Sequence, residues 1–185
     1  VSWAEFMQDH LPEETGKKLL ALVEAVPHDD HMIHGDYHTK NLELQDDEVL
    51  LIDMDTLAVG HPIFELGSMF NAYIGFFEIN HDAIMSFQGF SYEIAGKFWK
   101  KTLAKYLDTD VESVILGVED KARIIGYTRL IRRSIRRGGL EDKDRKAEID
   151  HWTKELVELV EKTDTLLFDN DLEEVKGNND LDIEA

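Results

Sequence analysis

The stretch "LELQDDEVLLID", residues 42–53, decides the fold class, because its apolar residues follow a different period from those of the rest of the chain. It first alternates apolar and polar residues, as a strand does, and then carries the turn residues Asp46 and Asp47. The apolar run at residues 49–52 predicts a second strand that is buried. We therefore expect a short hairpin within a helical chain, which is an α+β fold that is predominantly α.

Helical periodicity surrounds this hairpin on both sides. Ser2 and Glu5 are spaced as a capping box for a first helix, and Pro62 stands in the first turn of a helix that is apolar nearly all round and hence central. The expected helices cover about residues 2–11, 12–26, 63–77, 91–107, 119–137 and 143–168. We expect residues 1–168 to form one domain and the acidic residues 169–185, which lack aromatic side chains, to form a weakly ordered tail.

Composition narrows the classes of partner. The 185 residues carry a formal net charge of -19 and no cysteine. This acidic balance argues against binding to nucleic acid and favours metal ions or cationic small molecules. No apolar run approaches the roughly 18 residues of a membrane span, so we expect a cytoplasmic protein without a membrane partner. The chain does not begin with methionine, which suggests a piece of something longer.

The candidate site lies directly before the hairpin, in "MIHGDYHTKN" at residues 32–41. An aspartate, an asparagine five residues later and a hairpin that ends in another aspartate supply what phosphoryl transfer requires. Asp36 is the candidate catalytic residue, which orients an acceptor hydroxyl and takes its proton. Asn41 and Asp53 offer an amide oxygen and a carboxylate to Mg²⁺, which also contacts the nucleotide phosphates. If the strand stays extended, Asp55 points to the same side as Asp53 and could reach a second metal ion or hold the first ligand in place.

These residues resemble the aminoglycoside phosphotransferase and choline kinase-like family. "HGDYHTKN" followed by "LLIDMDTLAVGHPIFELGSMF" places His34, Asp36, Asn41 and Asp53 at the positions of that family's motif, with His38 two residues after the aspartate. The resemblance implies the large C-terminal lobe of a protein-kinase-like fold. It also implies Mg²⁺ and ATP or GTP as cofactors, a small-molecule hydroxyl as acceptor, and His34 as a structural residue of the loop.

The chain departs from the family pattern in two ways. "GHPIFE" replaces a Gly, Asp, Pro cluster before an aspartate, so His61 and Glu65 differ from the pattern and the supporting role of Glu65 in the loop stays open. The residues before His34 read as helices, with Lys17 and Lys18 adjacent on one of them, and not as a β-rich nucleotide lobe. We therefore expect the 185-residue chain alone not to turn over and to expose apolar surface that favours self-association.

Other functions remain open at this point. The first alternative is a non-catalytic binding or regulatory relative that kept the cleft without the nucleotide lobe. A metal-dependent phosphohydrolase using His81 and Asp82 is a more distant one, because no other histidine is placed to complete its ligand set. The upstream sequence of the gene would discriminate the enzyme from the binding protein.

Two polar clusters have simpler structural explanations. Four histidines, His28, His31, His34 and His38, have spacings that would suit a helical metal site, but Pro27 and Gly35 argue against a helix there. "RLIRRSIRR", residues 129–137, is expected to face solvent opposite a buried stripe, with a substrate phosphate contact as the alternative. The acidic balance of the chain gives a weak preference for a cationic acceptor.

Overall fold

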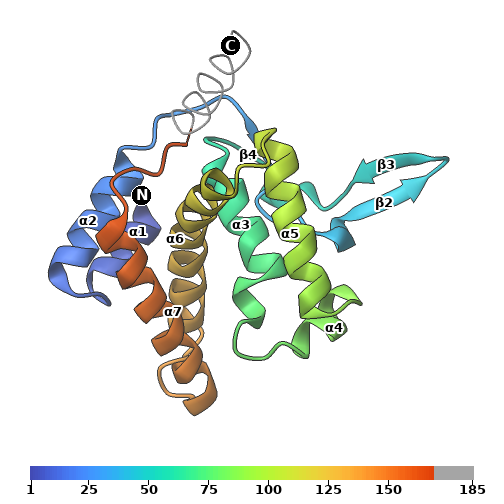
Figure 1. Cartoon of the computed structure of the whole chain (residues 1–185). Helices are drawn as coiled ribbons and strands as arrows, with labels where there is room; N and C mark the ends of the chain where they lie inside the picture. Colours follow the sequence, from blue (N-terminus) through green and yellow to red (C-terminus); the bar gives the residue numbers. More distant parts are fainter. Residues whose placement is uncertain (169–185) are drawn as a thin grey trace, which may run out of the picture.

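A computed structural model describes residues 1–168 of the chain, which are mostly helical with two small antiparallel sheets (Figure 1). The helices within these residues are α1 (Ser2–Gln8), α2 (Glu13–Glu24), α3 (Ile63–Tyr73), α4 (Ala83–Gln88), α5 (Tyr92–Leu107), α6 (Glu112–Arg136) and α7 (Lys143–Lys162). The strands are β1 (Met32–Ile33), β2 (Leu42–Gln45), β3 (Glu48–Leu51) and β4 (Ala58–Val59). The expected α+β, predominantly α content is confirmed. The acidic tail predicted at residues 169–185 lies outside the described residues.

Helices α3 and α6 form the centre of the molecule, with α1, α2 and α7 on one side and α5 on the other (Figure 1). Pro62, with a φ of -56°, directly precedes α3, and most residues of that helix are buried, as its apolar sequence predicted. The two central helices approach closely at a pair of glycines. A Cβ on Gly67 would lie 2.5 Å from Ile125 Cγ2, and one on Gly126 would lie 2.6 Å from Phe70 Cδ1.

We expect Gly67→Ala to lower the free energy of unfolding by about 1–3 kcal/mol, because the new methyl group forces α3 and α6 apart. The matched control is Gly96→Ala in α5, where no atom lies within 4 Å of the added Cβ. Alanine should stabilise that helix by up to about 1 kcal/mol. Urea unfolding of both variants measures the difference, and equal stabilities would contradict the close approach of α3 and α6.

Several predicted helix boundaries are wrong. Helix α6 begins at Glu112 and not near residue 119, because the buried side chains of Val114, Ile115 and Val118 extend its apolar stripe toward the amino terminus. Helix α7 ends at Lys162 and not at residue 168. The predicted capping box does not form, since Ser2 lies inside α1 and the residue before the helix makes no side-chain capping bond. The short helix α4 was not predicted.

The predicted hairpin is present, with β2 paired to β3 and Leu42 opposite Leu51. Asp46 and Asp47 form its turn in the left-handed region, with φ of 50° and 65°. The prediction of a buried second strand is wrong, because the side chains of Val49 and Leu50 are 68% and 37% exposed. The hairpin extends away from the helices, so neither of its faces packs on the core along most of its length (Figure 1).

A second small sheet, which the sequence did not predict, closes the segment that carries the candidate site. Met32 pairs with Val59 and Ile33 with Ala58, so β1 and β4 bring the two ends of residues 34–57 together. The N–H of Gly60 also donates to the carbonyl of His31 at 2.9 Å. The loop and the hairpin are therefore both anchored at the amino-terminal end of α3. None of the helices within residues 1–168 is long and apolar enough to cross a membrane.

Candidate active site

His34 joins the loop after β1 to the end of the hairpin. Its Nδ1 accepts a hydrogen bond from the N–H of Asp36 at 3.2 Å, and its Nε2 lies 2.9 Å from the carbonyl oxygen of Ile52. Since Nδ1 is the acceptor, this pattern assigns the ring proton to Nε2, which donates to Ile52. The side chain is buried. His34 thus fixes the residue before Asp53 relative to the backbone of Asp36.

Asn41 provides the second connection. Its Nδ2 donates to the backbone carbonyl of Asp36 at 2.8 Å. The backbone carbonyl of Asn41 accepts from the N–H of Ile52 at 2.9 Å. The bond from Nδ2 orients the amide, which leaves Oδ1 as the atom with capacity to bind a cation. Asn41 is buried, whereas Asp36 and Asp53 are exposed. Asn41 therefore links the backbone of Asp36 to that of Ile52, the residue directly before Asp53.

Asp53 has an unusual backbone conformation. It lies in the left-handed region, with φ 59° and ψ 62°, directly before the short 3₁₀ helix Met54–Thr56. Aspartate is among the residues that tolerate this conformation, and such strain concentrates at functional sites. The extended strand assumed for Asp55 is absent, because β3 ends at Leu51 and the chain turns at Asp53. The condition under which Asp55 was expected to point to the same side as Asp53 is therefore not met.

The oxygen atoms at the hairpin base suit Mg²⁺ by their chemistry. Mg²⁺ prefers amide and carboxylate oxygens and keeps several waters, so the Asn41 amide and the Asp53 carboxylate would supply part of its shell. Within residues 1–168, no three His, Asp or Glu side chains converge as in a closed metal site. A cation held by Asn41 and Asp53 would therefore take its remaining ligands from water and a bound substrate.

Glu65 of α3, whose supporting role the sequence left open, forms a hydrogen bond with the loop. Its Oε2 accepts a hydrogen bond from the N–H of Gly35 at 2.9 Å, and Ser68, one turn later, donates to the carbonyl of Gly35 at 2.5 Å. Thr56 donates to the carbonyl of His34, also at 2.5 Å. Gly35 has a φ of 79°, a conformation that favours glycine. Glu65 thus serves where the family pattern has an aspartate.

We expect Glu65→Ala to lower the free energy of unfolding by about 1–3 kcal/mol, because the N–H of Gly35 loses its charged acceptor. Glu93→Ala is the control, since Glu93 makes only an exposed ion pair with Lys97 at 2.6 Å, and such pairs contribute little. Denaturant titration measures both. Equal losses of stability in the two variants would contradict the role of Glu65. Glu65→Gln should recover part of the stability, because its amide oxygen can still accept the hydrogen bond from Gly35.

His38 packs beside Asp36 without forming a close hydrogen bond. Its Nε2 lies 3.7 Å from Asp36 Oδ2, and its ring meets Phe87 edge to face at 5.3 Å between centroids. The His38 side chain is buried, whereas the Asp36 side chain is 54% exposed. His38 therefore borders the carboxylate on its protein side, and the other side of Asp36 stays open.

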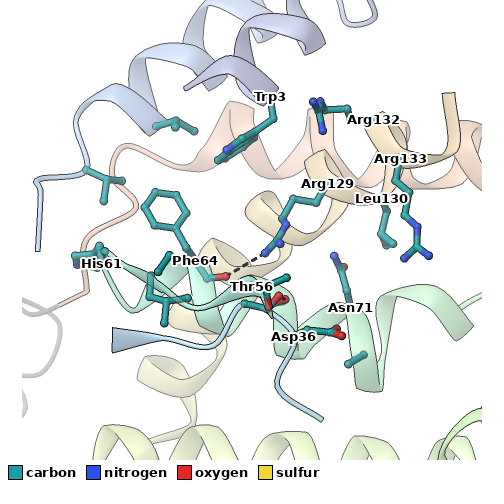
Figure 2. A pocket seen from close by; sticks show the side chains of 18 of the residues that line it. Trp3, Asp36, Thr56, His61, Phe64, Asn71, Arg129, Leu130, Arg132 and Arg133 are labelled. Atoms are coloured by element: carbon teal, nitrogen blue, oxygen red, sulfur yellow. Dashed lines mark hydrogen bonds between the residues drawn. The ribbon is translucent and has the colours of Figure 1, made fainter. Parts of the chain in front are cut away.

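That open side faces a cavity of about 1230 Å³ between α1, α3, α6 and the loop (Figure 2). Asp36, His38 and Thr56 line it, whereas Asn41 and Asp53 do not. Apolar side chains make up much of the remaining wall, among them Trp3, Val23, Phe64, Phe76, Phe77 and Leu130. Asp36 thus stands between the hairpin base and a pocket large enough for a small organic molecule.

Three arginines of α6 also line this cavity, in the run for which the sequence left a substrate phosphate contact as the alternative. Arg129, Arg132 and Arg133 belong to the run that was predicted to face solvent, and Arg129 and Arg133 are exposed as well as lining the cavity. Figure 2 shows Arg129 and Arg133 extending from α6 across the pocket from Asp36, and the Arg129 Nη1 atom lies 3.5 Å from the carbonyl of Phe64. The spacing of four residues between Arg129 and Arg133, which puts them on one helix face, is the signal that could have found them.

Desolvation in the pocket lowers the pKa of Arg129, and the carboxylates of Glu65 and Asp36 oppose that shift. The pKa of Arg133 is also lowered, first by desolvation and then by Arg137, while Asp36 acts in the opposite direction. Both guanidinium groups remain charged, because arginine does not lose its proton in proteins. Asp36 and the two arginines therefore share one electrostatic environment.

Residues 3–91 match the family model described as the phosphotransferase enzyme family. These residues, just under half of the chain, are therefore similar to that family. The resemblance seen in the sequence is thereby confirmed. No curated protein and no solved structure matches the chain. The phosphotransferase match includes Asp36, Asn41, Asp53 and Glu65, but it ends before α6, so the arginines of the pocket lie outside it.

Proposed function

We propose that the protein is a small-molecule phosphotransferase, which transfers the γ-phosphoryl group of ATP or GTP to a hydroxyl of a small acceptor. In this proposal residues 1–168 form the large C-terminal lobe of a protein-kinase-like fold. The observation that carries it is the position of Asp36 between two sites. On one side lie Asn41 and Asp53, fixed through the backbone of Ile52, and on the other lies the cavity.

Each residue has a role in this reaction that its surroundings support. Asp36 accepts a hydrogen bond from the acceptor hydroxyl, orients its oxygen toward the phosphoryl group and takes its proton. Asn41 and Asp53 hold Mg²⁺ near the hairpin base, and the metal ion, when bound, neutralises charge on the phosphates. His34, Glu65 and Ser68 keep the loop in place, and positioning is the main source of rate in phosphoryl transfer.

The test is a turnover screen with hydroxylated small molecules, Mg²⁺, and ATP or GTP, read by mass spectrometry of the acceptor. The longest chain that the gene encodes is assayed beside the 185-residue chain, which we expect to be inactive alone. A phosphorylated acceptor supports the proposal. Magnesium-dependent nucleotide binding without any phosphorylated product would instead favour a non-catalytic relative that binds the same ligands.

A further inference from the structure

Arg129 and Arg133 face the cavity without a carboxylate partner. Among the described residues, no Asp or Glu oxygen lies within 4.0 Å of either guanidinium group, which is the distance limit for an ion pair. This is unexpected in a chain with 39 acidic and 20 basic residues, where a carboxylate is available to most cations. Arg123, two turns earlier on the same helix, contacts both Asp120 and Glu155. The two pocket arginines are left with unused positive charge.

The helix dipole does not account for this arrangement. Cations are favoured at the carboxyl end of a helix, but the effect falls off within the last turn. Helix α6 ends at Arg136, so the dipole favours Arg133 and Arg136, whereas Arg129 lies about two turns from the end. The dipole therefore does not account for the position of Arg129.

The surroundings hold the two guanidinium groups in place and leave most of their donors free. Arg133 lies over the ring of Phe76, at 5.1 Å from its centroid, and Arg129 makes one long bond to the carbonyl of Phe64. A guanidinium group has five N–H donors in a fixed planar arrangement, which matches a carboxylate or a phosphate. Arg137 adds further positive charge near Arg133. A neutral or cationic ligand would leave this charge unbalanced.

We propose that Arg129 and Arg133 bind an acid group of the acceptor, a carboxylate or a phosphate monoester, while a hydroxyl of the same molecule contacts Asp36. This inference rests on the proposed function, whose substrate class it names. It replaces the cationic acceptor suggested by the overall charge, because a net charge of -19 is an average over the whole surface and the pocket wall has the opposite sign.

The position of the arginines favours the acceptor over the nucleotide as the source of the anion. Both residues line the cavity together with Asp36, whereas Asn41 and Asp53, the residues suited to the metal ion, are outside its lining. A nucleotide whose phosphates contact that metal ion would lie on the hairpin side of Asp36. The acceptor would then occupy the cavity, with its acid group toward α6.

Calorimetry on the 185-residue chain tests the anion site without requiring turnover. Glycerate and glycerol 3-phosphate are the anionic probes, and glycerol and ethanolamine are the neutral and cationic ones. We expect an anionic probe to bind more tightly than both others, and Arg133→Gln to weaken it about tenfold or more, as loss of a charged hydrogen bond predicts. Arg136→Gln is the matched control, since Arg136 is an exposed residue of α6 outside the cavity lining. Urea unfolding checks that both variants are folded.

Three outcomes would overturn the inference: no preference for either acid, equal losses in the Arg133 and Arg136 variants, or a rise in KM for ATP with KM for the acceptor unchanged. In the longest chain that the gene encodes, a higher KM for an acidic acceptor in Arg133→Gln, at unchanged KM for ATP, supports it. If anions bind in an arginine-dependent way but no phosphoryl group is transferred, the anion site is supported and the proposed function is rejected. Transfer to a neutral or cationic acceptor that is insensitive to Arg133→Gln keeps the function and rejects the anion site.

Discussion

Asp36→Asn should lower kcat by about 10²-fold to 10⁴-fold, the usual cost of losing a general base. Asparagine keeps the size of the side chain and a carbonyl oxygen, but it cannot take the proton of the acceptor hydroxyl. The backbone bonds of Asp36 to His34 and Asn41 do not involve its carboxylate, so the loop should keep its shape. Steady-state kinetics with a phosphorylated acceptor measure the change.

Nucleotide affinity is the internal control for this variant, because Asp36 lines the cavity in which we propose that the acceptor binds. The Kd of the Mg²⁺–nucleotide complex should stay within a few fold of the unmodified protein. His38→Asn is a useful companion, since the buried His38 ring lies next to Asp36 and packs on Phe87. Turnover of the Asp36 variant near that of the unmodified protein would reject Asp36 as the catalytic residue.

The second large effect is expected for Asp53→Ala, which should abolish magnesium-dependent nucleotide binding. Asp53 would provide the carboxylate ligand at the hairpin base, and without it the neutral amide oxygen of Asn41 would hold Mg²⁺ only weakly. Calorimetric titration with nucleotide in the presence and absence of Mg²⁺ measures the loss. We expect the magnesium-dependent part of the binding to disappear.

Asp47→Ala is the matched control, because Asp47 is also an exposed aspartate with a positive φ, 65° against 59° for Asp53. Both substitutions place alanine in a conformation that it disfavours, so strain alone should affect both variants alike. Asp47 lies at the far end of the hairpin, in its turn. Unchanged nucleotide binding in the Asp53 variant, or equal losses in both, would make Asp53 a structural residue.

The sequence was sufficient for the features that depend on neighbouring residues. The hairpin and its turn at Asp46 and Asp47 follow from local alternation and turn chemistry, and the loop from His34 to Asn41 follows from a motif of fixed spacing. Burial of the second strand was wrong because periodicity reports which residues are apolar, whereas burial depends on another element covering them. Val49 has no such cover in the described residues, and it is exposed.

The remaining features of the site depend on how distant helices pack. Glu65 and Gly35 are 30 residues apart, so their hydrogen bond follows from the position of α3 under the loop. The pocket arginines face Asp36 because α6 crosses α3 at Gly67 and Gly126, and one sequence does not specify that crossing. A spacing of four residues put Arg129 and Arg133 on the same face, but it could not say what that face would meet.

The close packing of α3 has a consequence for the size of the acceptor. One face of this helix holds the loop through Glu65 and Ser68, and another contacts α6 at Gly67, where there is no room for a methyl group. The loop that carries Asp36 and the helix α6 that carries Arg133 therefore both pack on α3, so the separation of the two residues cannot adjust freely to a ligand. If both ends of an acceptor are bound, homologous compounds of increasing chain length should react with one optimum, and shorter or longer members should lose one of the two contacts.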